Sequence, residues 1–172
     1  GINSEELATA LHHLGNALYH FGAISEGENV LRESVALRRR LFGNEDAATN
    51  AALRSLARNI YAQGNSDESL RMRRELLALH RRQFGSEHLT VALDLTEIAN
   101  IVRYRTGGRK EAEQNYREAL AIIRKDHNED HPMVAERLAG LGGLLLDMGR
   151  ITEAEDCIRR ALAVRQKVFG AM

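Results

Sequence analysis

The amino-acid sequence predicts an all-α fold built from repeated pairs of helices. The chain has one proline in 172 residues and few aromatic residues, and the alternating apolar and polar positions that are typical of strands are absent. Glycine recurs at a nearly constant interval, with 42, 43 and 42 residues separating Gly22, Gly64, Gly107 and Gly149. One pattern is also written four times, as ESVALRRRLFG, ELLALHRRQFG, EALAIIRKDHN and RALAVRQKVFG. Such periodicity is typical of helical repeat proteins.

Each repeat is expected to contain two helices that are separated by one of these glycines. Glycine readily takes the left-handed conformation that ends a helix. The predicted helices cover residues 4–21 and 25–42, then 47–63 and 66–84, then 89–106 and 109–126, and finally 133–148 and 151–169. Ser25 with Glu28, and Thr152 with Glu155, have the spacing of capping boxes at the start of second helices.

The stretch HNEDH at 127–131 first suggests a metal site, because two histidines four residues apart can share one face of a helix. The repeat pattern favours another interpretation. HNEDH is the third copy of a linker written GNEDA at 43–47 and GSEHL at 85–89. A turn is therefore expected between the histidines, with Pro132 opening the next helix. We expect no metal site, no cofactor and no catalytic activity, and we expect Cys157 to fill space in the core.

Composition narrows the classes of partner. The formal net charge is zero, so no overall field favours nucleic acid or an anionic membrane. No apolar run is long enough to cross a bilayer. The basic runs LRRR, RMRR and HRR at 37–40, 71–74 and 80–82 are interleaved with acids, which predicts a solvated face. One cysteine and the preference for arginine over lysine fit a cytoplasmic, bacterial protein.

The sequence resembles the tetratricopeptide repeat in its 42-residue form, the type found in kinesin light chains. The resemblance lies in Leu-Gly or Leu-Ala at 14–15, 56–57 and 141–142, with Ile-Ala at 98–99, and in the segments GRITEAE, ALAIIR, ALAVR and EDHPMVAERL. It covers residues 1–172 as a single array of four repeats, at about 4–43, 47–85, 89–127 and 132–170. The resemblance implies a right-handed superhelix whose first helices line a concave groove.

In this family the groove binds a peptide or a helix of a partner protein. The candidate residues are carried over by their positions around each Leu-Gly, Leu-Ala or Ile-Ala pair. They are His12, Asn16, Tyr19, His20, Arg54, Arg58, Tyr61, Asn100, Arg103 and Tyr104. Asparagine can pair with a peptide backbone, and arginine can bind a carboxylate with two hydrogen bonds. We therefore expect a protein or peptide partner with acidic character.

Other interpretations stay open at this point. Arg54 and Arg58 could simply solvate a helix face or pair with carboxylates of the next repeat, such as Asp94 or Glu97. The pattern ends at Gly170 without a polar capping helix, so we expect a fragment of a longer protein. An uncapped array could associate with itself through its ends. It could also be the sensor or adaptor arm of a larger bacterial signalling protein.

Overall fold

The computed structural model describes residues 3–170, and within them the chain forms eight α-helices. The helices are α1 Ser4–His20, α2 Ile24–Phe42, α3 Ala47–Ala62, α4 Ser66–Phe84, α5 Leu89–Val102, α6 Arg109–Asp126, α7 Pro132–Asp147 and α8 Ile151–Phe169. They pack as consecutive pairs, which confirms the predicted all-α repeat architecture. The chain divides into two compact units, residues 1–79 and 80–172, and the division falls within α4.

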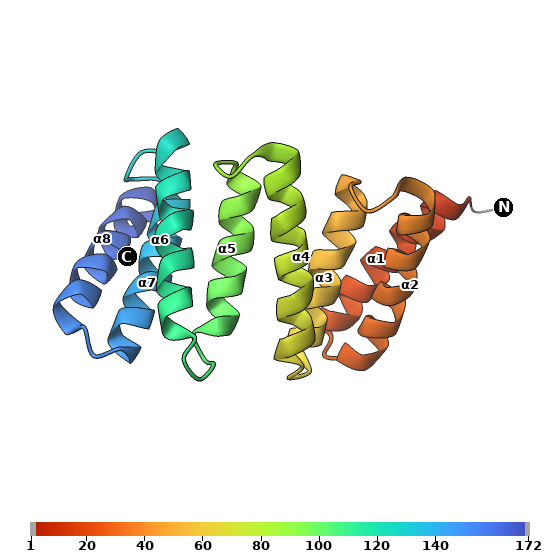
Figure 1. The fold of residues 1–172 in the computed structure, drawn as a ribbon, viewed down its shortest axis with the longest axis horizontal. Coiled ribbons are helices and arrows are strands. Elements are labelled where there is room, and N and C mark those ends of the chain that lie inside the picture. The colour runs from red at the N-terminus through yellow and green to blue at the C-terminus, as the bar shows by residue number, and fades with distance from the viewer. Residues whose placement is uncertain (1–2, 171–172) are drawn as a thin grey trace. The chain divides into compact units, whose positions relative to one another are not determined.

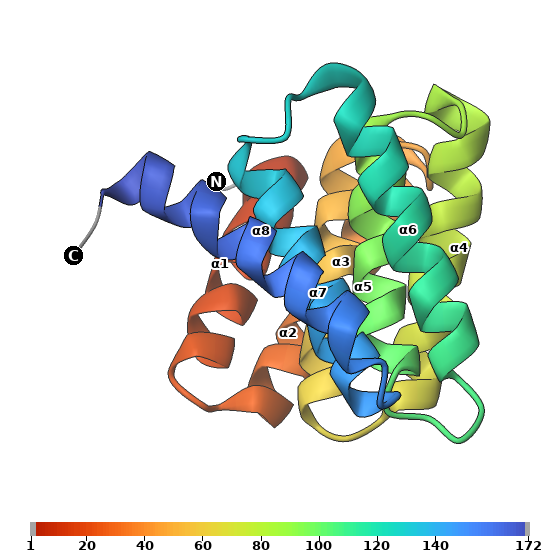
Figure 2. The ribbon, with the colours of Figure 1, turned by 90° about the vertical axis from the view of Figure 1, so that its left-hand side faces the viewer.

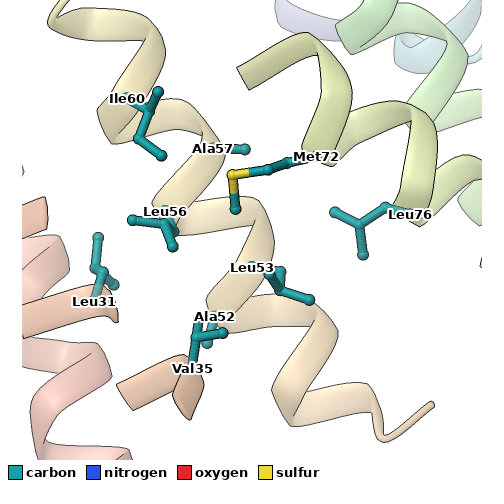
Figure 3. Packing of buried hydrophobic residues seen from close by; sticks show 9 residues of the cluster. All are labelled: Leu31, Val35, Ala52, Leu53, Leu56, Ala57, Ile60, Met72 and Leu76. Carbon is teal, nitrogen blue, oxygen red and sulfur yellow. The ribbon is translucent and has the colours of Figure 1, made fainter. Parts of the chain in front are cut away.

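In the first unit, α2 packs against both α1 and α3 (Figure 1). A cluster of buried aliphatic side chains and one methionine joins α2, α3 and α4 (Figure 3). Leu31 and Val35 of α2 lie on the side of α3 that carries Ala52 and Leu56, whereas Leu53 points toward Leu76 of α4. The burial of these side chains removes apolar surface from water, which is the main force that holds neighbouring repeats together.

In the second unit, α6 packs against both α5 and α7, and α7 packs against α8. The α5–α6 turn and the α7–α8 turn lie at the same end of this unit, as both Figure 1 and Figure 2 show. Tyr116 of α6 is only 1% exposed and fills the position that Leu31 fills in the first repeat. The last five residues of α4 belong to this unit, where the His80 ring contacts the Asp94 carboxylate of α5 at 2.5 Å.

The recurring glycines end α1, α3 and α7 as predicted, since Gly22, Gly64 and Gly149 directly follow the C-caps of these helices. Gly22 has a φ of +82°, which is a conformation that side chains with a Cβ rarely adopt. The Ala23 amide donates to the Leu18 carbonyl at 2.9 Å, and the Gly22 amide donates to the Tyr19 carbonyl at 3.2 Å. This is the bond pattern of a Schellman motif. It reverses the chain within very few residues, so that the second helix can pack against the first.

The predicted capping boxes at Ser25 and Thr152 are wrong. α2 begins at Ile24 and α8 begins at Ile151, so both hydroxyl residues already lie within the first helical turn. The short glycine turn makes the residue right after it the N-cap, and that residue is Ala23 or Arg150, neither of which makes a side-chain cap bond. A capping box does occur at the start of α1, where Asn3 and Glu6 exchange hydrogen bonds of 2.9 and 3.2 Å.

α5 is shorter than predicted, because it ends at Val102 and not at residue 106. The Arg105 amide donates to the Val102 carbonyl, and the Gly108 amide donates to the Arg105 carbonyl, both at 3.0 Å. These are tight-turn bonds that replace the helical ladder. The third repeat has one extra residue before Gly107, and the turn absorbs it.

The HNEDH stretch forms the turn that the repeat pattern predicted. α6 ends at Asp126, and α7 begins at Pro132 with His131 as its N-cap. The His131 Nδ1 accepts a hydrogen bond from the Met133 amide at 3.2 Å. The rings of His127 and His131 stack with their centroids 3.9 Å apart. The two histidines therefore cap and brace a helix junction.

Candidate functional site

In the first unit, the predicted site residues of α1 and α3 lie on two neighbouring helices that contact each other. We call this group the α1–α3 polar face. Its members are His12, Asn16, Tyr19 and His20 of α1, and Arg54, Arg58 and Tyr61 of α3. Hydrogen bonds across 42 and 43 residues of sequence link the two helices, because equivalent positions of consecutive first helices lie side by side.

Arg58 is at the centre of the α1–α3 polar face. Its Nη2 donates to the Asn16 Oδ1 at 2.8 Å, and its guanidinium carbon lies 4.4 Å from the centroid of the Tyr19 ring. Both partners are neutral. Within residues 3–79, Arg58 forms no ion pair with a carboxylate. The partners suggested by the sequence, Asp94 and Glu97, lie in the second unit, so that expectation stays a prediction. A guanidinium held by an amide and an aromatic face keeps its charge available for a ligand.

His12 lies one helical turn before Asn16, and its Nε2 is 2.9 Å from the Ser55 Oγ. Burial lowers the pKa of His12, and the nearby positive charges of Arg38 and Arg58 lower it further. The neutral imidazole is therefore favoured in the folded protein. Ser55 was missed in the sequence, because it stands 43 residues after His12, one position past Arg54, which the 42-residue spacing makes equivalent to His12.

In the second unit, the predicted residues Asn100, Arg103 and Tyr104 lie at the end of α5, and we call them the α5 cluster. Only Asn100 lies within the helix, because Arg103 is the C-cap and Tyr104 belongs to the turn. Placing Arg103 and Tyr104 on a regular helix was therefore wrong, since the extra residue of this repeat ends α5 early. Tyr104 is 73% exposed, and the Arg103 guanidinium lies 5.0 Å from its ring centroid.

The α5 cluster is tied to its neighbours by polar contacts. Arg103 donates to Asp147 at the end of α7 at 2.5 Å, and the Tyr116 hydroxyl donates to the Asn100 Oδ1. Burial alone would lower the pKa of Arg103, but its hydrogen bonds to Asp147 and Tyr116 hold the pKa above its ordinary value. Burial raises the pKa of the Tyr116 phenol. Arg103 thus has a carboxylate partner, whereas Arg58 does not have one in its unit.

The basic runs on the second helices form the expected solvated face only in part, because most of their arginines are exposed but one basic residue of each run is buried. Arg38, Arg73 and His80 are 5%, 7% and 2% exposed. Arg38 reaches α1 and donates to the Thr9 hydroxyl at 3.0 Å, and Arg81 pairs with Glu118 of α6 at 2.6 Å. Alternate members of each run face inward because helical periodicity turns them toward the neighbouring helix. A run of basic residues in the sequence does not reveal this inward orientation, because it does not show which side of the helix each residue faces.

Cys157 is 9% exposed, and burial together with nearby Asp156 raises the pKa of its thiol. A raised pKa keeps the thiol protonated and weakly nucleophilic. Among residues 3–170, no group of three or more histidine, cysteine or acidic side chains is arranged to hold a metal ion. Over the same residues, no helix has the length and apolar character needed to cross a membrane.

The fold and its polar first helices define a helical-repeat protein made of paired antiparallel helices. Two models of the tetratricopeptide repeat match the chain, one at residues 7–48 and the other at 48–125 and 97–167. The chain therefore belongs to the tetratricopeptide repeat family. Repeat domains of this family typically serve as protein-interaction modules and are generally non-catalytic. A comparison with curated proteins finds no match.

Several solved structures share the fold at low sequence identity. One is the structure of nearly identical tetratricopeptide-like repeats from Podosopora anserina, described as a kinesin light chain. It has a TM-score of 0.83 and 22% identity, over 99% of this chain and 81% of that chain. BtubC (BKLC) from P. vanneervenii has a TM-score of 0.85 and 16% identity, over 99% and 67%. The apo form of RapI has a TM-score of 0.79 and 16% identity, over 96% and 44%.

Proposed function

We propose that this chain is a non-catalytic protein-interaction module whose first helices bind a segment of a partner protein that carries an acidic group. The observation that carries the proposal is the state of Arg58, which is held by Asn16 and Tyr19 with no carboxylate from its own unit. A charged side chain that is already oriented loses little conformational freedom when a ligand binds. Its planar fork matches the two oxygens of a carboxylate.

Amide and aromatic side chains on the first helices of each unit support the same assignment. Asn16 and the α5 residue Asn100 each have an amide group, and Asn100 keeps its nitrogen available because its oxygen accepts from Tyr116. Tyr61 is 38% exposed and Tyr104 is 73% exposed. Exposed tyrosines provide contact area with few rotamers to restrict, which favours the binding of peptides.

A peptide-display selection on the parent chain and on the Asn16→Ala, Arg58→Ala, Asn100→Ala triple variant tests the proposal. We expect peptides enriched in Asp or Glu that bind the parent and lose at least tenfold in affinity for the triple variant. The matched control is Arg40→Ala, Arg82→Ala, Gln114→Ala, which removes three exposed polar side chains of second helices. Equal binding to the parent and to the triple variant would refute the proposed site.

A second function, self-association, is favoured by the outer face of α8. Ile151, Ile158 and Leu162 are 60%, 38% and 53% exposed. The positions of Ile158 and Leu162 correspond to buried residues of earlier repeats, as Leu31 at 0% and Leu120 at 5% illustrate. We propose that this face can bind another repeat, and sedimentation velocity over a range of concentrations tests it. Ile151→Arg with Leu162→Arg should abolish any concentration-dependent increase in mass, and a parent that stays monomeric throughout would exclude self-association.

A further inference from the structure

A cavity of about 780 Å³ lies at one end of the second unit. It is formed by the α5–α6 turn and by the C-terminal end of α7, which lie at the same end of this unit (Figure 2). We call it the α5–α6 cavity. The lining residues that matter here are Arg103, Tyr104, Arg105, Arg109, Lys110 and Asp147. Four of these six side chains are cationic, one is aromatic, and one is a carboxylate.

Helix stability does not explain the positive charge of this cavity. Arg109 and Lys110 occupy the first turn of α6, where the helix dipole favours acidic side chains and disfavours cations. The first turns of α1, α2, α4 and α8 contain acidic residues and no lysine or arginine. The first turn of α6 also has an acid, Glu111, but Arg109 and Lys110 come before it. Within residues 80–170, neither Arg109 nor Lys110 forms an ion pair. These two charges are therefore placed against the preference of their own helix.

The basic side chains of the cavity come from the third repeat, whereas Asp147 comes from the fourth. The interval from Gly64 to Gly107 is 43 residues, and the extra residue lengthens the turn after α5. The positions that correspond to Arg109 and Lys110 are Ile24 and Ser25 in the first repeat, Ser66 and Asp67 in the second, and Ile151 and Thr152 in the fourth. Two cationic residues at the start of the second helix are therefore not a general feature of the repeat.

One carboxylate, that of Asp147, already occupies part of this basic cavity. Its Oδ2 accepts from the Arg103 Nη2 at 2.5 Å, and its side chain is 42% exposed, whereas that of Arg103 is 14% exposed. Tyr104 projects beside the pair with 73% of its surface exposed. The internal contact therefore shows the geometry with which Arg103 binds a carboxylate, and an exposed aspartate can move away from it.

We propose that the α5–α6 cavity binds an acidic segment of a partner protein, and that Asp147 occupies Arg103 until a carboxylate of the partner takes its place. This inference rests on the proposed function and names the chemistry of a second contact point. Arg109 and Lys110 attract the segment and contact its second acid, while Tyr104 packs against its backbone or side chains. Asp147 limits the affinity, so that a single carboxylate binds weakly and two adjacent acids are needed.

The test uses a labelled hexaglutamate peptide as probe, hexaglutamine as the uncharged control, and backbone amide NMR shifts of the intact chain as readout. We expect saturable shifts in residues 103–110 and 147–148 with hexaglutamate alone. Asp147→Asn should tighten binding at least threefold, and Asp126→Asn, which removes the same charge from the far end of α6, should leave it unchanged. Arg109→Gln with Lys110→Gln should weaken binding at least fivefold, and the control Arg40→Gln with Arg82→Gln should not.

Several results would overturn the inference. Shifts elsewhere, equal effects of Asp147→Asn and Asp126→Asn, or tighter binding of an octauridine RNA to the same residues would each do so. Thermal melts of every variant confirm that the fold is retained.

The binding of the display-selected peptides distinguishes failure of this inference from failure of the proposed function. If the cavity variants leave their binding intact while Arg58→Ala abolishes it, the cavity proposal alone fails. If neither the cavity variants nor Arg58→Ala reduces the binding of these peptides, both proposals fail.

Discussion

At the scale of single residues, Arg58 and Arg103 show how the same side chain serves two roles. Arg58 is oriented by the Asn16 oxygen and the Tyr19 ring, whereas Arg103 is engaged by Asp147. An arginine with neutral partners retains its full attraction for an external anion, while one paired with a carboxylate has to exchange partners. The two positions therefore make different contributions to binding, although both were predicted as residues of the same groove.

Replacing Arg58 by lysine should weaken the binding of an acidic display-selected peptide about tenfold. Lysine keeps the charge but loses the planar fork, the second donor and the stacking on Tyr19. Fluorescence anisotropy of the labelled peptide measures the change, and Arg58→Ala should lose at least as much. The free energy of unfolding of Arg58→Lys should fall by only about 1 kcal/mol, because the lost hydrogen bond to Asn16 is half-buried. Binding by Arg58→Lys that equals the parent would show that charge alone matters.

The lowered pKa of His12 predicts that the folded state is less stable in acid. Between the folded pKa and the ordinary value of 6.5, the unfolded chain binds more protons than the folded one, so stability rises with pH in that window. The contribution is fully present above the ordinary pKa and is lost as the pH falls below it. Urea unfolding from about pH 5 to pH 8 should show this loss in the parent.

The His12→Gln variant isolates the His12 contribution from those of the other histidines. Glutamine can still bond to the Ser55 hydroxyl but does not titrate. The parent should therefore lose more stability on acidification than the variant does. Parallel curves for the two proteins would show that His12 has the same pKa in the folded and unfolded states.

At the scale of helices, the repeats differ in how freely the side chain that faces a helix-contact glycine can move. A Cβ added at Gly15 would lie 2.5 Å from the Leu31 Cγ, which belongs to a fully buried side chain. At the corresponding Gly142, an added Cβ would lie 2.7 Å from the Ile158 Cγ1, and Ile158 is 38% exposed. A buried leucine has no space to move into, whereas an exposed isoleucine can rotate away.

Gly15→Ala should therefore lower the free energy of unfolding by about 1–3 kcal/mol through overpacking. Gly142→Ala should be neutral or stabilise by up to about 1 kcal/mol, because alanine favours helix more than glycine does. Urea denaturation of the two variants measures both values. Equal destabilisation by the two substitutions would show that Ile158 is held as firmly as Leu31.

The second repeat shows how an element tolerates polar substitutions at its helix contacts. Ser69 is fully buried where other repeats have glycine or alanine, and its hydroxyl donates to the Ala57 carbonyl at 2.7 Å. Ser34 of α2 makes the equivalent bond to the Ala8 carbonyl of α1 at 2.7 Å. A small hydroxyl that bonds to the neighbouring backbone satisfies its own polarity, so the helices can still approach closely.

At the scale of the whole molecule, each helix pair depends on the next one for burial. Leu31 and Val35 are 0% and 4% exposed, and α3 places Ala52 and Leu56 beside them (Figure 3). A single pair would leave these side chains in water. This is the physical reason why such repeats occur in arrays and why their stability is shared between neighbours.

A fragment of residues 1–43 should therefore be largely unfolded, whereas a fragment of residues 1–84 should fold cooperatively. Burial of the two exposed aliphatic side chains is worth about 1.5–3 kcal/mol each, which is a large share of the stability of so short a segment. Far-UV circular dichroism during thermal melting distinguishes the two fragments. A sigmoidal melt of 1–43 at low concentration would contradict this account.

The repeat period, the glycine turns and the HNEDH linker could be read from the sequence because they depend on local backbone preferences. Glycine ends a helix wherever it takes a positive φ, and a 42-residue period specifies which segments are equivalent. These properties also placed Asn16 and Arg58 at corresponding positions of consecutive first helices. The sequence by itself therefore determined the family, the helices to within a few residues, and the membership of the α1–α3 polar face.

Tertiary structure decided which of these residues touch. Arg58 bonds to Asn16 and stacks on Tyr19, Arg103 binds Asp147, and Arg38 turns inward to Thr9. Each contact joins segments 29 to 44 residues apart and depends on the rotation of one helix against another. The early end of α5, which creates the α5–α6 cavity, follows from one inserted residue. Helix packing angles and rotamers settle such features, and no local sequence rule encodes them.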